Sequence, residues 1–289
     1  MKIALDPTMF RTLSLAGTIH TVAELGYQYV ELSPREDFLP FFVHPRADKT
    51  RITELATALR ETGVTIASVL PLYRWSSPDE TQRQAAVRYW KRAIQISVEL
   101  GCQQMNSEFN GRPEHPAECE AAFWRSMEEL LPVFEREGVA LNLEPHPDDF
   151  CETNTGGVNL VRAINKPWVN YLYCAPHTFH LSGTHPGADI PTMIRDAGDR
   201  LTHVHIADSF NHKGSSGLRY ILNPPGTPAR IHQHLDIGQG EVDFDAFFAT
   251  LRAIDFDGIA TVAVFAWEEH AHQSSTAMLK RLRTELPTP

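Results

Sequence analysis

The sequence has few of the residues and runs that mark several protein classes. It contains only four cysteines in 289 residues and no Cys-x-x-Cys pair, so a disulfide framework is not expected. No stretch reaches the roughly 18 uncharged apolar residues that a membrane span needs. The first ten residues, MKIALDPTMF, lead straight into an apolar run and do not have the build of a signal peptide. We therefore expect a cytoplasmic protein.

Basic residues are also scarce relative to acidic ones. Lysine and arginine total 26, aspartate and glutamate total 36, and the formal net charge is −10. Nucleic-acid binding needs a basic surface that contacts phosphates, so this class of partner is not expected. Hydrophobic residues make up 42% of the chain and charged residues 21%, which is ordinary for a globular protein and excludes wholesale disorder.

Histidine, by contrast, is abundant. There are 14 histidines, and nine of them lie between His146 and His234. Imidazole is the commonest metal ligand and the usual acid or base at neutral pH. We therefore expect this segment to carry the chemistry.

An internal repeat indicates the fold. A helix-like segment, a glycine and a β-rich run occur four times, with the glycines at Gly26, Gly63, Gly101 and Gly138. Glycine suits the left-handed position that ends a helix, so the unit is a strand and a helix repeated about every 37 residues. Residues 2–10, 170–178, 201–208 and 259–267 read as strands one, six, seven and eight.

Eight such units predict an α/β fold, a (β/α)8 TIM barrel forming a single domain over residues 1–289. An open doubly wound sheet is the alternative, but no G-x-G-x-x-G follows the first strand. The long irregular stretch 209–240 follows strand seven. We expect it to lie over the C-terminal mouth of the barrel, where this fold builds its active sites.

Polar residues gather where the strands are predicted to end. Glu108 ends strand four, and Glu144 and His146 end strand five. His177 and His180 follow strand six, and two histidines and Asp208 lie on strand seven. Burying charged groups costs free energy unless they are paired or bind a ligand. Charged and imidazole groups at the ends of core strands therefore indicate a partner or ligand at that place.

Four motifs carry a family resemblance. They are E-x-H at residues 144–146, T-x-H at 178–180, H-V-H-x-x-D at 203–208 and H-x-x-I-G-x-G-E-V-D-F at 234–244. With these, the whole chain resembles the sugar phosphate isomerase/epimerase family, also described as the xylose isomerase-like or AP endonuclease family 2 barrels. It looks closest to the inositol-catabolic branch and to the barrel subunit of bacterial C-glycoside deglycosidases.

The resemblance implies one divalent metal, held in the family by a Glu, an Asp, a His and a Glu from strands five to eight. Glu144 and His205 match the first and third ligands, whereas His177 stands at the strand-six position and Ala263 at the strand-eight position. The expected ligands are therefore Glu144, His177, His205 and His234. Manganese is the expected metal, with zinc, iron or cobalt as alternatives.

The missing strand-eight carboxylate bears on the reaction. The resembling epimerases flank the substrate with two carboxylates, so its loss argues for one-base chemistry. The first expectation is a metal-dependent lyase that enolises a 3-oxo sugar and eliminates the aglycone, with His146 and Glu144 as catalytic residues. The alternative is an isomerase or epimerase that acts on a keto-sugar or keto-inositol by the same enolisation.

Further expectations concern the substrate and partners. His180, Glu108, His232 and Arg74 are expected to bind a sugar or glycoside. The lyase resemblance implies a small β-rich partner subunit, and we expect an oligomer. A second metal near His180 and His232 and a non-catalytic sugar-binding barrel stay open as alternatives. The acidic charge and an incomplete ligand set argue against a DNA-repair endonuclease.

Overall fold

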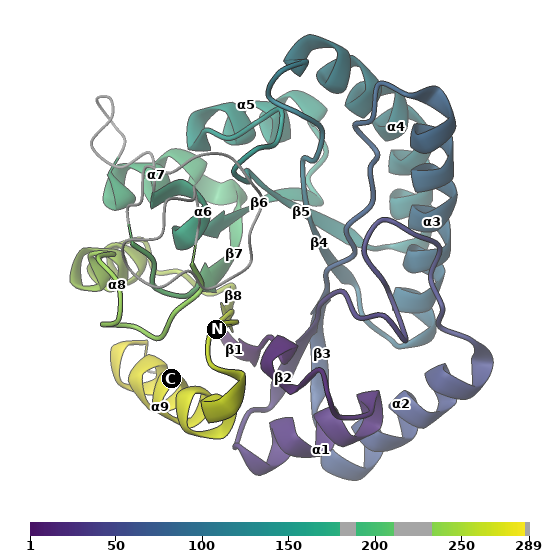
Figure 1. Cartoon of the computed structure of the whole chain (residues 1–289). Helices are drawn as coiled ribbons and strands as arrows, with labels where there is room; N and C mark the ends of the chain where they lie inside the picture. Colours follow the sequence, from purple (N-terminus) through teal and green to yellow (C-terminus); the bar gives the residue numbers. More distant parts are fainter. Residues whose placement is uncertain (180–188, 211–232, 287–289) are drawn as a thin grey trace.

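The structure is a computed structural model that describes residues 1–179, 189–210 and 233–286. Eight parallel strands pair in chain order, and the last pairs with the first, so the sheet closes into a barrel (Figure 1). The predicted (β/α)8 barrel is confirmed. The strands are β1 (Lys2–Leu5), β2 (Tyr29–Leu32), β3 (Thr65–Val69), β4 (Gln104–Glu108), β5 (Ala140–Glu144), β6 (Val169–Cys174), β7 (Leu201–Ile206) and β8 (Ile259–Val262).

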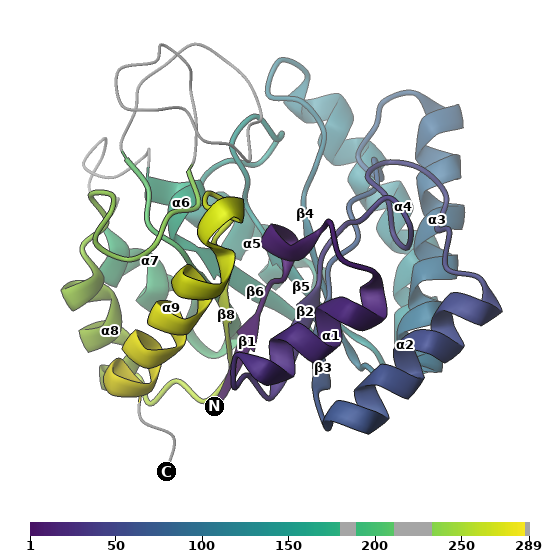
Figure 2. The ribbon, with the colours of Figure 1, turned by 60° about the horizontal axis from the view of Figure 1, so that its bottom comes forward.

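The helices lie outside the ring of strands (Figures 1 and 2). The ring of helices closes where the last helix meets the start of the chain, because Tyr27 Oη donates to Ser275 O at 2.7 Å. The α-helices are α1 (Leu15–Glu24), α2 (Lys49–Thr62), α3 (Glu80–Glu99), α4 (Pro116–Glu137), α5 (Asn154–Ile164), α6 (Ala175–Phe179), α7 (Ile190–Ala197), α8 (Phe244–Ala253) and α9 (Ala271–Glu285). Short 3-10 turns are η1 (Thr8–Phe10), η2 (Gly198–Arg200) and η3 (Glu268–His270).

The repeated glycines end helices, as the spacing predicts. Gly63 caps α2 with φ 73° and Gly138 caps α4 with φ 66°. A side chain is strained at such positive φ angles, so glycine lets the chain leave the helix and enter the next strand at once. This geometry recurs in the first half of the barrel.

All four strands with a predicted range end earlier than the sequence indicates, β1 at Leu5 and β7 at Ile206 among them. β6 ends at Cys174, where the predicted strand continues to residue 178, and α6 begins at the next residue. Pro176 explains the change, because proline fits the first turn of a helix, where a backbone N–H needs no partner. His177 therefore lies on a short helix at the barrel mouth. β8 likewise ends at Val262, so Ala263 lies just beyond it.

Asp208 does not lie on a strand, although it was predicted on strand seven. It follows β7 by two residues and pairs with Leu235 in an isolated bridge. Its carboxylate accepts backbone N–H groups of Ser209, Gly238, Gly240 and Val242 at 2.8–3.0 Å. One buried side chain thus anchors both described ends of the predicted loop 209–240, whose residues 211–232 lie outside the described part of the chain.

Within the described ranges, no helix is long and apolar enough to cross a membrane. All four cysteines are buried free thiols.

Candidate active site

A cavity of about 1030 Å³ lies at the C-terminal ends of the strands. Glu108 and Glu144, which end the neighbouring strands β4 and β5 in register, both line it. His177, His205 and His234 line it too. The apolar part of the wall comes mostly from the β1 to β3 side and from the segment after β8, and includes Leu32, Phe38, Phe41, Leu70, Leu72 and Phe265.

The four residues predicted to hold a metal lie together at this cavity. Glu144 Oε2 is 3.2 Å from His177 Nδ1 and 3.5 Å from His205 Nδ1. His177 Nε2 lies 3.2 Å from His234 Nε2. The four side chains come from β5, α6, β7 and the segment before α8, and each of these residues is at most 3% exposed.

The backbone after β8 fixes the orientation of His234. His234 Nδ1 lies 2.6 Å from the carbonyl oxygen of Ala263, which can only accept a hydrogen bond. We therefore assign the proton to Nδ1, which leaves the Nε2 lone pair directed toward His177. The ring stacks on Phe265 with centroids 4.3 Å apart, and burial lowers the His234 pKa to about 3. His234 is thus presented as a neutral imidazole.

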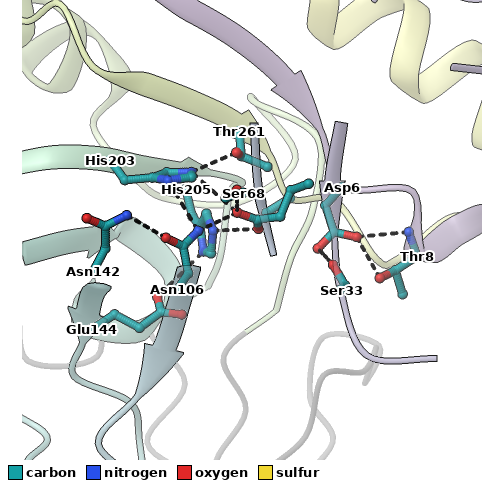
Figure 3. A network of polar contacts seen from close by, with 12 residues as sticks. Asp6, Thr8, Ser33, Ser68, Asn106, Asn142, Glu144, His203, His205 and Thr261 are labelled. Carbon is teal, nitrogen blue, oxygen red and sulfur yellow. Dashed lines mark hydrogen bonds and ion pairs between the residues drawn. The ribbon is translucent and has the colours of Figure 1, made fainter. Parts of the chain in front are cut away.

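His205 is held between two glutamates. Its Nε2 lies 2.9 Å from Glu31 Oε1, and its Nδ1 faces Glu144 (Figure 3). Burial works against a charged imidazole, but the charges of Glu31 and Glu144 outweigh it and raise the His205 pKa well above its usual value. The same contact acts on Glu31. Although burial would raise its pKa, His205 and His203 hold the pKa below its usual value.

A buried polar network supports Glu31 from below. Its Oε2 accepts hydrogen bonds from Ser68 Oγ and Asn106 Nδ2, both at 2.5 Å (Figure 3). His203 Nε2 lies 3.5 Å from the same oxygen and 2.8 Å from Thr261 Oγ1, and burial lowers the His203 pKa to about 3. His203 therefore belongs to the barrel interior.

The donor set fits a divalent transition metal. One carboxylate and three imidazoles suit manganese, zinc or iron, and neutral imidazole is the form that binds metal. Glu144 Oε2 is buried and lies 3.2 Å from His177 Nδ1 and 3.5 Å from His205 Nδ1, so this carboxylate oxygen is surrounded by further candidate ligands. The four donors form two neighbouring pairs, with 3.2 Å between His177 Nε2 and His234 Nε2 and 3.5 Å between His205 Nδ1 and Glu144 Oε2.

Cys174 is a member of this cluster that the sequence reasoning missed. Its Sγ lies within 4.8 Å of donor atoms of His177 and His234, and of Glu144 and His205. Burial raises the pKa of its thiol to about 12. The signal was a cysteine at the predicted carboxyl end of strand six, three residues before His177.

His146 lies behind the cavity wall. It was expected to act beside Glu144, but β5 ends at Glu144 and His146 lies beyond the strand. His146 is fully buried and is not among the residues that line the cavity. Its Nε2 lies 3.5 Å from Glu108 Oε1, and its ring packs edge-on against His177 with centroids 4.4 Å apart.

Asp149 adds a second carboxylate to the group that Glu108 and His146 form behind the cavity wall. Asp149 lies with Glu108 and His146 so that one donor atom of each falls within 4.8 Å of the others. Burial first, and then the charge of Glu108, raise the Asp149 pKa well above its usual value. Glu108 is the member of the three that reaches the cavity.

The remaining predicted binding residues lie elsewhere or outside the description. Arg74 is exposed, with its guanidinium 4.4 Å from the centre of the Phe42 ring, and it does not line the cavity. Arg35 does line the cavity but is paired with Asp37 at 2.6 Å. His180 and His232 fall outside the described residues.

Comparison with known proteins identifies the family. The model of the xylose isomerase-like TIM barrel family matches residues 19–282. The chain belongs to this family. Among curated proteins, it is 24% identical over 274 residues to an L-ribulose-5-phosphate 3-epimerase, UlaE, of Salmonella paratyphi C, covering 89% of this chain and 83% of the relative.

Solved structures share the fold. The E. coli 3-keto-D-glucoside 4-epimerase YcjR superposes with a TM-score of 0.73 at 20% identity, covering 98% of this chain and 99% of that chain. The IolI protein, whose structure holds a zinc atom, superposes with a TM-score of 0.74 at 18% identity, covering 99% and 98%. The expected resemblance to the isomerase and epimerase family is thus confirmed.

Proposed function

We propose that this protein is a divalent-metal-dependent keto-sugar isomerase or epimerase. The single observation that carries the proposal is the convergence of Glu144, His177, His205 and His234 on one cavity beside the carboxylate of Glu108. The UlaE and YcjR relatives, both epimerases by name, support this reaction class. They favour the alternative drawn from the sequence over elimination of an aglycone.

The proposed chemistry starts with removal of a proton from the carbon next to a ketone. Glu144 is the proposed base, and Glu108 lies beside it on the neighbouring strand, where it would bind a sugar hydroxyl. A metal bound by Glu144 and the three histidines would act as a Lewis acid that polarises the carbonyl. Manganese is the proposed metal, and zinc in the IolI structure supports zinc as the first alternative.

His146 then acts as a positioning residue in this proposal. It contacts Glu108 on one side and His177 on the other, and its Nδ1 lies 2.7 Å from Pro147 O. Since it is buried behind both residues, it would hold the carboxylate and the imidazole in place rather than meet the substrate.

Elimination of an aglycone from a 3-oxo glycoside stays the second candidate. The observation that favours it is the size of the cavity, about 1030 Å³, together with the apolar wall that includes Leu32, Phe38 and Phe265. Such a wall suits an apolar substituent on the sugar. Three further expectations also stay predictions. They are the β-rich partner subunit, the oligomer and the cytoplasmic location.

The test is a product assay in D2O followed by NMR. Metal-loaded protein is mixed with L-ribulose, D-tagatose and 3-oxo O- and C-glycosides, with Glu144→Gln as the inactive control and His115→Ala, an exposed histidine, as the matched active control. Deuterium next to the carbonyl with an isomer or epimer supports the proposal. Release of aglycone supports the second candidate, and neither signal with any metal or probe contradicts both.

A further inference from the structure

A carboxylate, Asp6, lies beside Ala263, the position at which the strand-eight carboxylate is missing. β1 and β8 pair in register with Leu5 opposite Val262, and Asp6 N donates to Val262 O at 2.9 Å. Asp6 and Ala263 therefore follow the two paired strands side by side. Thr261 faces the barrel interior, where it contacts His203. Ala263 N still donates to Ile206 O at 3.1 Å, so the pairing continues one residue past β8 and Ala263 shares the interior face.

Asp6 belongs to the same cavity as the metal cluster. It is only 2% exposed and it lines the cavity with Glu144 and His205. In a closed barrel of eight strands, β1 is four strands away from β5 in both directions, so the two strands lie on opposite sides. Asp6 and Glu144 lie on either side of His205 in the close view (Figure 3).

Three other carboxylates on the Asp6 side of the cavity are paired with basic residues. Asp37 pairs with Arg35 at 2.6 Å, Glu36 pairs with Arg46 at 3.3 Å, and Glu268 pairs with Arg11. Asp6 forms no ion pair with a basic residue in the described part of the chain. It accepts hydrogen bonds from Thr8 N at 2.9 Å, from Thr8 Oγ1 at 2.7 Å and from Ser33 Oγ.

The protonation of Asp6 is suited to proton transfer near neutral pH. Burial first, and then the charge of Glu31, raise the Asp6 pKa to about 6, against hydrogen bonds from Ser33 and Thr8 that lower it. An acid or base works best when its pKa lies near the working pH. The hydroxyls of Ser33 and Thr8 keep the carboxylate oriented while it gains or loses a proton.

We infer that Asp6 is a second catalytic residue, which faces Glu144 across the substrate and takes the place of the carboxylate absent at Ala263. The inference rests on the proposed function and narrows it to epimerisation, in which one carbon is inverted. It restores the two-carboxylate arrangement that the loss of the strand-eight glutamate argued against.

The proposed step balances with these two groups alone. Glu144 takes the proton from the carbon next to the ketone, the C–H electron pair forms a C=C bond, and the carbonyl π pair moves onto oxygen. Asp6 in its acid form then donates its proton to the opposite face of that carbon, and the carbonyl reforms. Glu144 ends protonated and Asp6 ionised, and exchange with water resets both groups.

The experiment compares proton exchange with product formation in Asp6→Asn. The probes are L-ribulose, D-tagatose and methyl 3-oxo-β-D-glucoside in D2O with the metal-loaded protein. We expect epimer formation to fall about 100-fold, while deuterium still enters the unreacted sugar with retained configuration at a rate within tenfold of wild type. Asp37→Asn removes a paired carboxylate from the same cavity and is expected to stay within twofold on both measures.

Several results would overturn the inference. Unchanged epimer formation in Asp6→Asn removes Asp6 from the reaction. If Asp6→Asn loses deuterium exchange as well as epimer formation, with fold and metal content unchanged, Asp6 acts in the proton removal assigned to Glu144. That result contradicts the arrangement of the two carboxylates on opposite faces of the sugar. An isomer formed without inversion keeps the proposed function but contradicts this inference, whereas no exchange in wild type with any probe overturns both.

Two further measurements keep the test independent of the folding of one variant. Asp6→Ser, whose hydroxyl can still accept from Thr8 N, replaces Asp6→Asn if that variant does not fold, with the same expected results. The second uses wild type alone, with a sugar deuterated at the reacting carbon and a single turnover in H2O. Two opposed carboxylates give an epimer without that deuterium, and direct return of the label to the inverted carbon contradicts the inference.

Discussion

His205 Nε2 lies 2.9 Å from Glu31 Oε1, deep in the barrel and beneath the proposed metal ligands. Glu31 is thus a hydrogen-bond partner that orients the His205 ring, and Nδ1 is the atom that faces Glu144. Glu31 thereby positions a proposed metal ligand from beneath.

The first prediction follows from this pair. Glu31→Gln removes the charge that polarises His205, and we expect metal affinity to fall about 10–100-fold. Competition with a chelating dye measures it. Ser68→Ala is the matched control, because it removes a hydrogen bond to the other oxygen of Glu31 and leaves the His205 contact. Equal metal affinity of Glu31→Gln and wild type would contradict the role assigned to Glu31.

The second prediction concerns metal removal. A ligand that binds only the folded state stabilises it by about 2.7 kcal/mol when present at about 100 times its Kd. We expect chelation to lower the Tm of wild type, and His234→Ala to lose most of this dependence. The exposed His115→Ala variant keeps it. A Tm that does not respond to chelation or added metal would count against the metal site.

The third prediction is a pH dependence of stability caused by Asp6. Its folded-state pKa of about 6 exceeds the value of 3.8 for a free aspartate, so the folded state binds the proton more tightly. The stabilisation is therefore present below about pH 4 and is lost as the pH rises through 6. At ~1.36 kcal/mol per pKa unit, the free energy of unfolding of wild type relative to Asp6→Asn should fall by about 3 kcal/mol. Urea unfolding of both proteins between about pH 4 and about pH 7 measures the difference, and a constant difference would contradict the assignment.

The fourth prediction concerns the anchor of the loop that carries His234. In wild type, backbone N–H groups donate to a carboxylate oxygen of Asp208. Asp208→Asn places an amide NH2 donor against those N–H groups, and we expect the free energy of unfolding to fall by about 3 kcal/mol. Metal affinity should fall too, since Leu235, next to His234, pairs with Asp208 in both directions. Asp243→Asn, which caps α8 nearby through one hydrogen bond to Ala246, is the milder control. Equal stability of the two variants would contradict the anchoring role.

Much of this protein follows from its sequence. The regular glycines and apolar runs determine the barrel, because helix termination and strand burial depend on neighbouring residues in the chain. Glu144, His177, His205 and His234 could be named in advance from the family resemblance. The first three follow or end neighbouring strands, and the carboxyl ends of parallel strands meet at one mouth. The same rule applied to strands one and two points to Asp6 and Glu31, which the sequence reasoning passed over.

Only the tertiary structure decided how these residues face one another. Alternation along β5 could not place His146, because the strand ends at Glu144 and the chain turns behind Glu108. The tautomer of His234 depends on the carbonyl of Ala263, and the neighbour of Ala263 depends on the register of β1 with β8. These relationships join residues that are 29 and 257 positions apart, and they arise from closure of the barrel, which brings the first strand against the last.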